Sequence, residues 1–176
     1  MSLTLEVAVE SFPIAGSFTI SRGSRTEAVV VSVALSDGRV TGRGECVPYA
    51  RYGETVDGVV ATIRTVEPHL AEPGFDRARL AEVMPAGAAR NALDCALWDL
   101  EAKRAGVPVA ERLGLAATTP LVTAYTLSVG TPESMHDKAK EAAHRPLLKV
   151  KLGGDGDPDR IAAVRAGAPN PRLVAD

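Results

Sequence analysis

Residues 147–176 of this 176-residue chain read LLKVKLGGDGDPDRIAAVRAGAPNPRLVAD, and they give the clearest indication of the fold class. The two ends of this stretch, 147–152 and 172–176, are predicted to be strands. Between them, an Asp-Pro pair opens a helix that is predicted to end near Gly167. A strand, a helix and a second strand in this order predict two parallel strands of an α/β sheet.

The same succession of elements extends upstream. Residues 121–129 predict another strand, and Thr131-Pro132 opens a helix that is predicted to run to about His144. Three parallel strands with two helices leave two sheet edges without a partner. A barrel of such units needs about eight of them and ~250 residues. We therefore expect residues 120–176 to be the start of a larger α/β (TIM-type) barrel, with a complete three-stranded α/β layer as the alternative.

Residues 1–119 predict a different architecture, with strands first and helices second. Polar and apolar residues alternate near the N-terminus, and an Asp-Gly pair separates two further strand-like runs, which is a hairpin signal. We expect residues 12–26, which contain Pro and Gly, to form a connecting loop. The predicted strands are 3–10, 27–35 and 40–45, and the predicted helices are 56–66, 76–84 and 88 to about 106. This order is typical of an α+β unit.

The composition argues against several classes of protein. Lys plus Arg number 20 and Asp plus Glu 22, a net charge of −2 that argues against a nucleic-acid-binding surface. No apolar run approaches the ~18 residues of a membrane span, and the N-terminus lacks the pattern of a secretory signal. Cys46 and Cys95 show no Cys-x-x-Cys spacing, which suits a reducing compartment. We therefore expect a cytoplasmic protein that binds neither nucleic acid nor membrane.

Two lysines in the strand 147–152 are the strongest candidates for chemistry. Side chains alternate between the faces of a strand, so Lys149 and Lys151 share one face while Leu148 and Val150 point to the other. Two residues apart on a strand, the amine tips are expected about 6.6 Å from each other. Neighbouring like charges favour loss of a proton from one amine, and a neutral amine is a general base. The alternative is an edge strand with a solvated face.

Asp176 follows a predicted strand, and ligands bind at the carboxyl ends of strands in α/β sheets and barrels. A carboxylate in this place suits Mg²⁺, which takes oxygen ligands. One carboxylate is not a metal site by itself. A capping or salt-bridging Asp is therefore the alternative.

Two glycine-rich stretches and one loop are weaker candidates. Gly42-Arg43-Gly44 lacks the third glycine of a dinucleotide-binding turn, so we expect a strand with close backbone contacts. Residues 153–156 precede a helix and could hold a phosphate, but neighbouring carboxylates would repel an anion, so we expect a tight turn and a helix N-cap. Arg22 lies in the predicted loop, where an arginine either binds a carboxylate or stays solvated.

Four stretches carry a resemblance to a known family: RGSRTE at 22–27, GRGECVPY at 42–49 with RYGE at 51–54, PAGAARNALDCALWDL at 85–100, and KVK at 149–151. Together they resemble the enolase superfamily, and within it the muconate-lactonizing subgroup. The nearest likeness is to the bacterial L-Ala-D/L-Glu (dipeptide) epimerases. It runs essentially from one end of the chain to the other.

The resemblance implies an α+β N-terminal capping domain at 1–119 and the first strands and helices of a TIM-type barrel at 120–176. It also implies roles for particular residues. By this likeness Lys151 is an acid/base lysine, and Lys149 is its electrostatic neighbour. Asp176 is the first of three carboxylate ligands of Mg²⁺. The residues that contact the substrate are Arg22, Thr126, Tyr49 and Tyr52. The other two ligands and a lysine for the opposite face would lie beyond residue 176 of a longer chain.

The activity that the resemblance implies is Mg²⁺-dependent epimerisation of a dipeptide, by abstraction of an α-proton and stabilisation of the enolate. Other activities of the subgroup stay open: cycloisomerase, o-succinylbenzoate synthase and N-acylamino acid racemase. A catalytically inactive chain is the alternative from a different class. The likeness further implies a cytoplasmic homo-oligomer that acts in peptidoglycan recycling.

Overall fold

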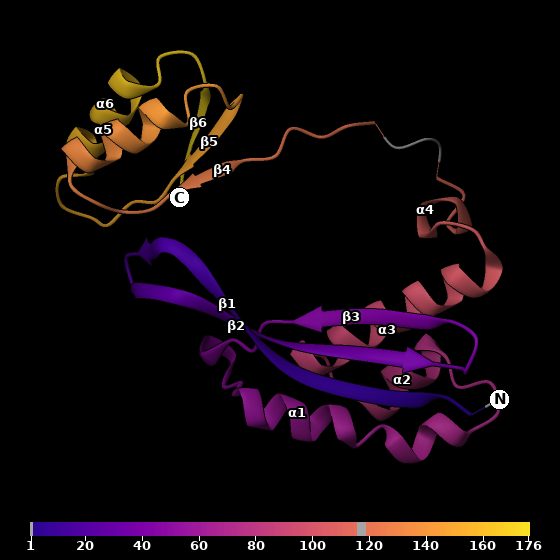
Figure 1. Ribbon diagram of the computed structural model, residues 1–176. Coiled ribbons are helices and arrows are strands. Elements are labelled where there is room, and N and C mark those ends of the chain that lie inside the picture. Colours follow the sequence, from indigo (N-terminus) through magenta and orange to yellow (C-terminus); the bar gives the residue numbers. More distant parts are fainter. Residues whose placement is uncertain (1, 116–118) are drawn as a thin grey trace. The chain divides into compact units, whose positions relative to one another are not determined.

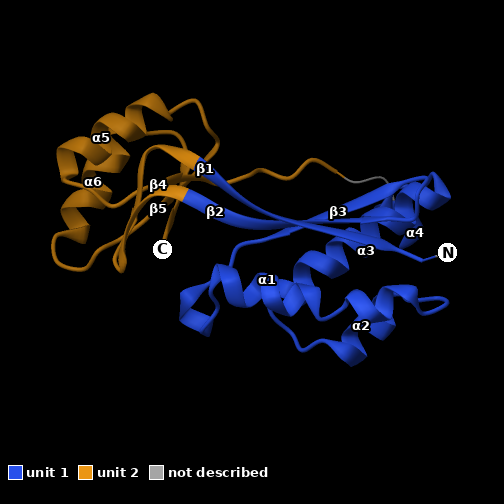
Figure 2. Ribbon diagram, turned by 60° about the horizontal axis from the view of Figure 1, so that its bottom comes forward, with its two compact units in different colours: residues 1–12, 28–118 blue, residues 13–27, 119–176 orange. Residues whose placement is uncertain are grey.

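The computed structural model describes residues 2–115 and 119–176 (Figure 1). The chain divides into two compact units, coloured separately in Figure 2. Unit 1 comprises Met1–Phe12 and Ala28–Thr118, and unit 2 comprises Pro13–Glu27 and Thr119–Asp176. Each unit has its own hydrophobic core. The division assigns an N-terminal segment to unit 2, whereas the predicted boundary at 119/120 cuts the chain once; that boundary stays a prediction.

Three strands form the first sheet, in the order β1-β2-β3. They are β1 (Thr4–Ile20), β2 (Gly23–Ser36) and β3 (Thr41–Cys46). Strands β2 and β3 are antiparallel, as the Asp-Gly hairpin signal predicts. Asp37 stabilises the connection, because its Oδ1 accepts hydrogen bonds from the backbone N–H groups of Arg39 and Val40 at 2.9 and 3.0 Å.

The predicted loop at 12–26 is wrong. Strand β1 continues to Ile20 and β2 begins at Gly23, so only a short turn separates them. The physical reason is tertiary pairing: the sheet order places β1 at an edge, where a strand tolerates Pro13 because one row of its backbone N–H groups needs no partner. Local Pro and Gly content does not reveal this pairing.

The predicted helices of unit 1 are present, with bounds set by recognisable caps. Thr55 accepts a hydrogen bond from Gly58 N, and Asp76 accepts one from Arg79 N, each at a helix N-terminus. Three further helices of three to five residues were not predicted, because they are too short to show an apolar period. The helices are η1 (Ala50–Tyr52), α1 (Val56–Arg64), η2 (Glu67–Ala71), α2 (Arg77–Val83), α3 (Ala88–Ala105) and α4 (Val109–Arg112).

Helix α3 packs directly on β3, and two glycines make this possible. A Cβ atom added at Gly42 would collide with the carbonyl oxygen of Ala96, and one added at Gly44 with that of Ala92. The predicted close backbone contact at this Gly-x-Gly is confirmed. Val31, Val33 and Leu35 of β2 and Ala92, Leu93, Ala96, Leu97 and Leu100 of α3 belong to one buried cluster.

Unit 2 contains a parallel sheet in the order β4-β5-β6, consisting of β4 (Tyr125–Leu127), β5 (Leu147–Val150) and β6 (Arg172–Ala175). Helices α5 (Pro132–Glu141) and α6 (Asp157–Gly167) connect the strands. The strand predicted at 121–129 is wrong in extent, because β4 pairs with β5 over three residues only. Within the described residues the sheet has three strands and does not close into a barrel.

The core of unit 2 lies under one face of this sheet. The buried residues of the cluster are Leu127, Met135, Ala139, Ala142, Leu148, Val150, Val164 and Ala168. Helices α5 and α6 approach each other closely at Gly167, where an added Cβ would collide with the carbonyl oxygen of His136. A segment of the β1–β2 hairpin belongs to the same unit, and Val129 N donates to Thr19 O at 3.1 Å.

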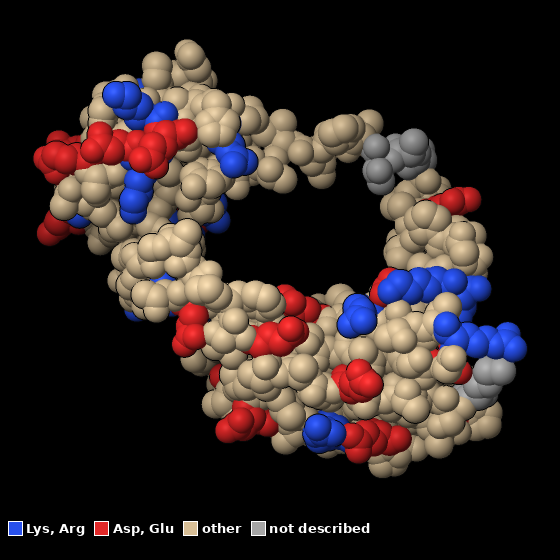
Figure 3. All heavy atoms as spheres, in the orientation of Figure 1, with Lys and Arg blue, Asp and Glu red and all other residues tan. Residues whose placement is uncertain are grey.

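Charged side chains of both signs are interspersed on one face of the molecule (Figure 3). On the face drawn in Figure 3, Lys and Arg lie among Asp and Glu on both units rather than in one broad basic patch. This distribution agrees with the near-neutral net charge of −2. None of the helices in the described part of the chain has the length and apolar character that a membrane span requires.

Candidate functional site

The two faces of β5 carry different side chains. Leu148 and Val150 are fully buried, and Lys149 lies between them on the opposite face, as strand alternation predicts. Lys151 follows the last residue of β5, but its backbone N–H donates to Leu127 O at 3.0 Å. This hydrogen bond to β4 holds the backbone of Lys151 in line with the strand.

Both lysines reach the carboxylate of Asp176. Lys149 Nζ lies 2.6 Å from Asp176 Oδ2, and Lys151 Nζ donates a hydrogen bond to the same oxygen. The register explains this arrangement, because Val150 lies opposite Ala175 and the next residue on each strand is Lys151 and Asp176. The expected separation of about 6.6 Å between the amine tips is therefore wrong: the two flexible side chains converge on one oxygen.

This cluster is charged and open to solvent. The two lysine side chains hold the pKa of Asp176 at about 2, Lys149 contributing the larger effect and Lys151 the next. The exposed fractions are 39% for Asp176, 37% for Lys149 and 20% for Lys151. Two cations on one anion leave an excess positive charge at the carboxyl end of the sheet. A small anionic ligand, such as a carboxylate, can approach it from solvent.

The described residues do not make up a magnesium site by themselves. Asp176 offers carboxylate oxygens at the end of a strand, which is the donor type that Mg²⁺ takes. Among the described residues, no group of three His, Cys, Asp or Glu side chains lies close enough together to hold a metal ion. Asp176 can therefore be one ligand, and it is already held by two ammonium groups.

The register also places Thr126 next to this cluster. Thr126 of β4 lies opposite Lys149 of β5, and partners in a parallel sheet point to the same side. Its half-buried side chain thus belongs to the same face as the lysines. Arg22 lies exposed at the turn between β1 and β2 and belongs to unit 2 as well. Its predicted contact with a substrate stays a prediction.

The two predicted tyrosines lie together in unit 1. The ring centroids of Tyr49 and Tyr52 are 5.7 Å apart, and the side chain of Tyr52 is largely exposed. Glu54, which the sequence reasoning missed, fastens this loop: it accepts hydrogen bonds from Ala88 N at 2.7 Å and from Tyr49 N at 2.9 Å. These two bonds, that from Ala88 first, lower the pKa of Glu54.

A signal for Glu54 was available in the sequence. Gly87 is the N-cap of α3 and offers no side-chain acceptor, so the first N–H groups of that helix need an acceptor from elsewhere. A carboxylate from a preceding loop is a suitable partner. What the sequence could not indicate is which of the nearby carboxylates supplies it.

The glycine-rich turn after β5 does not present a phosphate site. Asp157 Oδ1 accepts from Gly153 N at 3.0 Å and Oδ2 accepts from Gly154 N at 2.8 Å. The backbone N–H groups that an anion would need are thus occupied by a carboxylate of the chain itself. A tight turn is confirmed, while the N-cap is Gly156 and its helix end has no side-chain cap.

The comparisons with known proteins agree with this architecture. Residues 2–114 match the family described as mandelate racemase / muconate lactonizing enzyme, N-terminal domain. The chain belongs to this family. The predicted resemblance to the enolase superfamily and the predicted α+β capping domain are thereby confirmed.

Individual members of the family are similar over nearly the whole chain. The L-Ala-D/L-Glu epimerase of Escherichia coli (strain K12) is 44% identical over 175 residues, which is 98% of this chain and 54% of that protein. The crystal structure of an enolase family member from Agrobacterium tumefaciens with homology to dipeptide epimerases, with bound sodium and L-Ala-L-Glu, is 53% identical with a TM-score of 0.93. The match covers 99% of this chain and 53% of that one.

A third relative was solved with a different cation. The dipeptide epimerase of Cytophaga hutchinsonii, complexed with Mg and the dipeptide D-Ala-L-Val, is 27% identical with a TM-score of 0.89, and the match covers 100% of this chain and 52% of that one. The present chain spans about half the length of each of these three proteins.

Proposed function

We propose that the protein carrying this chain is an isomerase, a Mg²⁺-dependent epimerase of dipeptides of the L-Ala-D/L-Glu type. The observation that carries the proposal is the convergence of Lys149 and Lys151 on Asp176 at the carboxyl end of a parallel sheet. The identity to the L-Ala-D/L-Glu epimerase of Escherichia coli supports the substrate class. This chain spans 54% of that relative, so the proposal concerns the whole protein.

The chemistry requires a base beside a stabilised negative charge. A hydrogen on the carbon next to a carboxylate or amide is weakly acidic, so its removal needs both a positioned base and positive charge near the developing enolate. We assign the proton abstraction to Lys151 in its neutral amine form and the electrostatic role to Lys149, which lies on the same face. Epimerisation needs a second base on the opposite face of the enolate, and the candidates described here serve one face.

The remaining site residues follow the same proposal. Thr126 would donate a hydrogen bond to the substrate from the strand next to Lys149. Arg22 would bind the acidic end of the dipeptide through its guanidinium group. Tyr49 and Tyr52 would contact the substrate from the loop that Glu54 fastens. Asp176 would be one ligand of Mg²⁺, an ion that stabilises negative charge on an enolate oxygen when bound.

The proposal extends to the organisation of the protein. We propose a capping domain at 1–119, a barrel that begins at 120, a homo-oligomeric assembly, and a cytoplasmic role in peptidoglycan recycling. The change from an antiparallel to a parallel sheet along the chain supports the two-domain arrangement.

The test of the catalytic proposal is hydrogen exchange at carbon. The whole purified protein with Mg²⁺ should exchange the α-hydrogen of the C-terminal residue of L-Ala-L-Glu with D₂O. Lys151→Met should lower this rate by about 10²–10⁴-fold, because a general base of this kind contributes that much. Lys140→Met, at an exposed lysine of α5, is the matched control and should exchange normally. Near-normal exchange by Lys151→Met, with wild-type circular dichroism, would remove Lys151 from the mechanism.

The metal assignment has a separate test. Asp176→Asn in the whole protein should weaken Mg²⁺ binding, measured by calorimetric titration, because an amide oxygen is a poorer ligand than a carboxylate for a hard cation. Asp159→Asn, an exposed carboxylate on α6, should bind Mg²⁺ like the wild type. An unchanged titration for Asp176→Asn would count against Asp176 as a ligand.

A further inference from the structure

A second charged cluster lies in the loop that follows Lys151, outside the residues discussed for catalysis. The loop runs from the end of β5 to the start of α6 and contains three glycines, Gly153, Gly154 and Gly156. Such a loop is mobile unless side chains hold it. Asp157 holds its first half, because each carboxylate oxygen accepts one backbone N–H, from Gly153 and from Gly154.

Arg160 holds the same loop from the first turns of α6. Its Nη1 donates to Asp157 Oδ1 at 2.8 Å and to the carbonyl oxygen of Asp155 at 2.7 Å. Its Nε donates to the carbonyl oxygen of Gly130 at 3.0 Å. Gly130 lies in the loop after β4, so one guanidinium group joins the loops that follow two neighbouring strands.

Asp157 and Arg160 lie where they can hold the backbone next to Lys151. The side chains of Asp157 and Arg160 are only 19% and 21% exposed, so solvent competes little for these bonds. Lys151 lies two residues before Gly153, which Asp157 binds. On its other side Lys151 donates its backbone N–H to Leu127 O. The backbone of Lys151 is therefore held between the sheet and this pair.

We propose that Asp157 and Arg160 are positioning residues that fix the loop after β5 and thereby the place of the Lys151 amine. Neither touches the reacting atoms; they act through Gly153, Gly154 and Gly130. The guanidinium fork is essential to this role, because a lysine ammonium at 160 is a point charge that cannot match the three acceptors in their fixed directions. The catalytic part of the inference rests on the proposed epimerase activity.

The experiment compares Arg160→Lys and Asp157→Asn with Arg165→Lys in the whole protein. Arg165 is the matched control, because it lies on the same helix and also donates to backbone carbonyls, those of Ala168, Pro169 and Pro171, at the other end of α6. The two test variants should lower kcat for L-Ala-L-Glu by about 10–10²-fold and leave KM within about twofold, because a small misplacement of a catalytic group costs this much. Arg165→Lys should keep the wild-type kcat.

A second readout separates this inference from the proposed function. Amide hydrogen exchange at Gly153 and Gly154 should become at least about tenfold faster in Arg160→Lys and Asp157→Asn, whether or not the protein turns over a dipeptide. A wild-type protein that is inactive on dipeptides, with this exchange pattern, defeats the proposed function and leaves the loop assignment standing. Unchanged amide exchange, or an equal loss of kcat in Arg165→Lys, overturns the inference.

Discussion

The two units of the molecule use charge in different ways. In unit 1 two of the ion pairs join separate elements: Arg77 of α2 pairs with Glu101 of α3, and Arg104 of α3 pairs with Asp37 of the hairpin turn. In unit 2 three charges converge at one end of the sheet, where Lys149, Lys151 and Asp176 meet. These bridging pairs fasten one element of the unit to another, whereas the converging charges meet where β5 and β6 end. The converging group in unit 2 is the one to which we assign the proposed chemistry.

The units also share a packing feature. In both, the backbones of two elements come into close contact at a glycine. In unit 1 Gly42 and Gly44 admit α3 onto β3, and in unit 2 Gly167 admits α6 onto α5. A side chain at any of these positions must displace a backbone rather than a flexible side chain. The two close contacts differ in the position of the glycine. Gly42 and Gly44 lie within the strand β3, whereas Gly167 is the last residue of the helix α6.

The largest effect is expected from Gly44→Ala. The added methyl group would overlap the carbonyl oxygen of Ala92 in α3, and overpacking of this kind costs about 1–3 kcal/mol, with the upper part of that range expected against backbone. We expect the unfolding free energy of unit 1, measured by urea denaturation, to fall by that amount. Arg43→Ala, on the exposed face of the same strand, is the control and should change it by less than about 0.5 kcal/mol. Equal stabilities would contradict the assigned close approach.

Much of unit 1 follows from the sequence alone, and the limits of that reasoning are physical. The Asp-Gly hairpin and the apolar stripe of α3 are local signals, and they predict their elements correctly. The strand character of 12–26 is not local, because β1–β2 pairing overrides its Pro and Gly residues. The capping function of Glu54 depends on two segments that are distant in the chain.

The same distinction applies to the candidate site. Alternation along β5 predicts that Lys149 and Lys151 share a face, and the structure agrees. Their convergence on one oxygen depends on the register between β5 and β6, which no local pattern encodes. The role of Arg160 likewise requires the loop after β4 to lie beside the loop after β5.

An intermediate effect is expected from Gly167→Ala. The methyl group would overlap the carbonyl oxygen of His136, but alanine is a better helix former than glycine by up to about 1 kcal/mol, which offsets part of the cost. We expect the free energy of unfolding of unit 2 to fall by about 1 kcal/mol. Amide hydrogen exchange in α5 and α6 measures this loss. Ala166→Ser, at an exposed neighbour, should leave that exchange unchanged. If Gly167→Ala lowered the free energy of unfolding of unit 2 as much as Gly44→Ala lowers that of unit 1, the two glycine contacts would not differ in energy.

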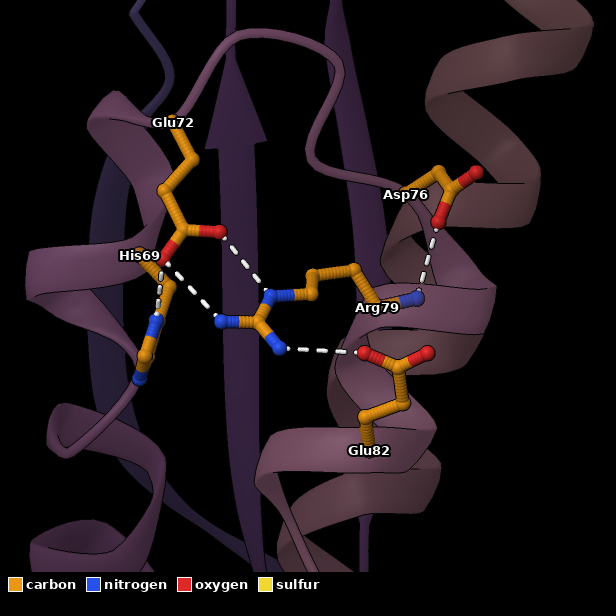
Figure 4. A network of polar contacts seen from close by, with 5 residues as sticks. All are labelled: His69, Glu72, Asp76, Arg79 and Glu82. Carbon is orange, nitrogen blue, oxygen red and sulfur yellow. Dashed lines mark hydrogen bonds and ion pairs between the residues drawn. The ribbon is translucent and has the colours of Figure 1, made fainter.

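The smallest effect concerns a bridging network of unit 1, in which Glu72 binds both His69 and Arg79 (Figure 4). Arg79 also contacts Glu82, and its backbone N–H donates to Asp76. Hydrogen bonds from the Arg79 side chain, and next from His69, lower the pKa of Glu72 from 4.5 to about 2. Because the folded-state pKa is below the unfolded-state value, the carboxylate stabilises unit 1 fully above about pH 4.5 and loses this contribution as the pH falls toward about 2.

Glu72→Gln should therefore lower the urea midpoint of unit 1 at about pH 7, and the difference from the wild type should shrink steadily below about pH 4.5 and vanish near about pH 2. The difference at neutral pH should be small, because the Glu72 and Arg79 side chains are 38% and 40% exposed and solvent screens the pair. Glu67→Gln is the control, because that exposed carboxylate pairs with Arg64 outside this network. A difference that grows on acidification would mean that Glu72 is bound in its neutral form, and bridging charges would then not distinguish unit 1 from unit 2.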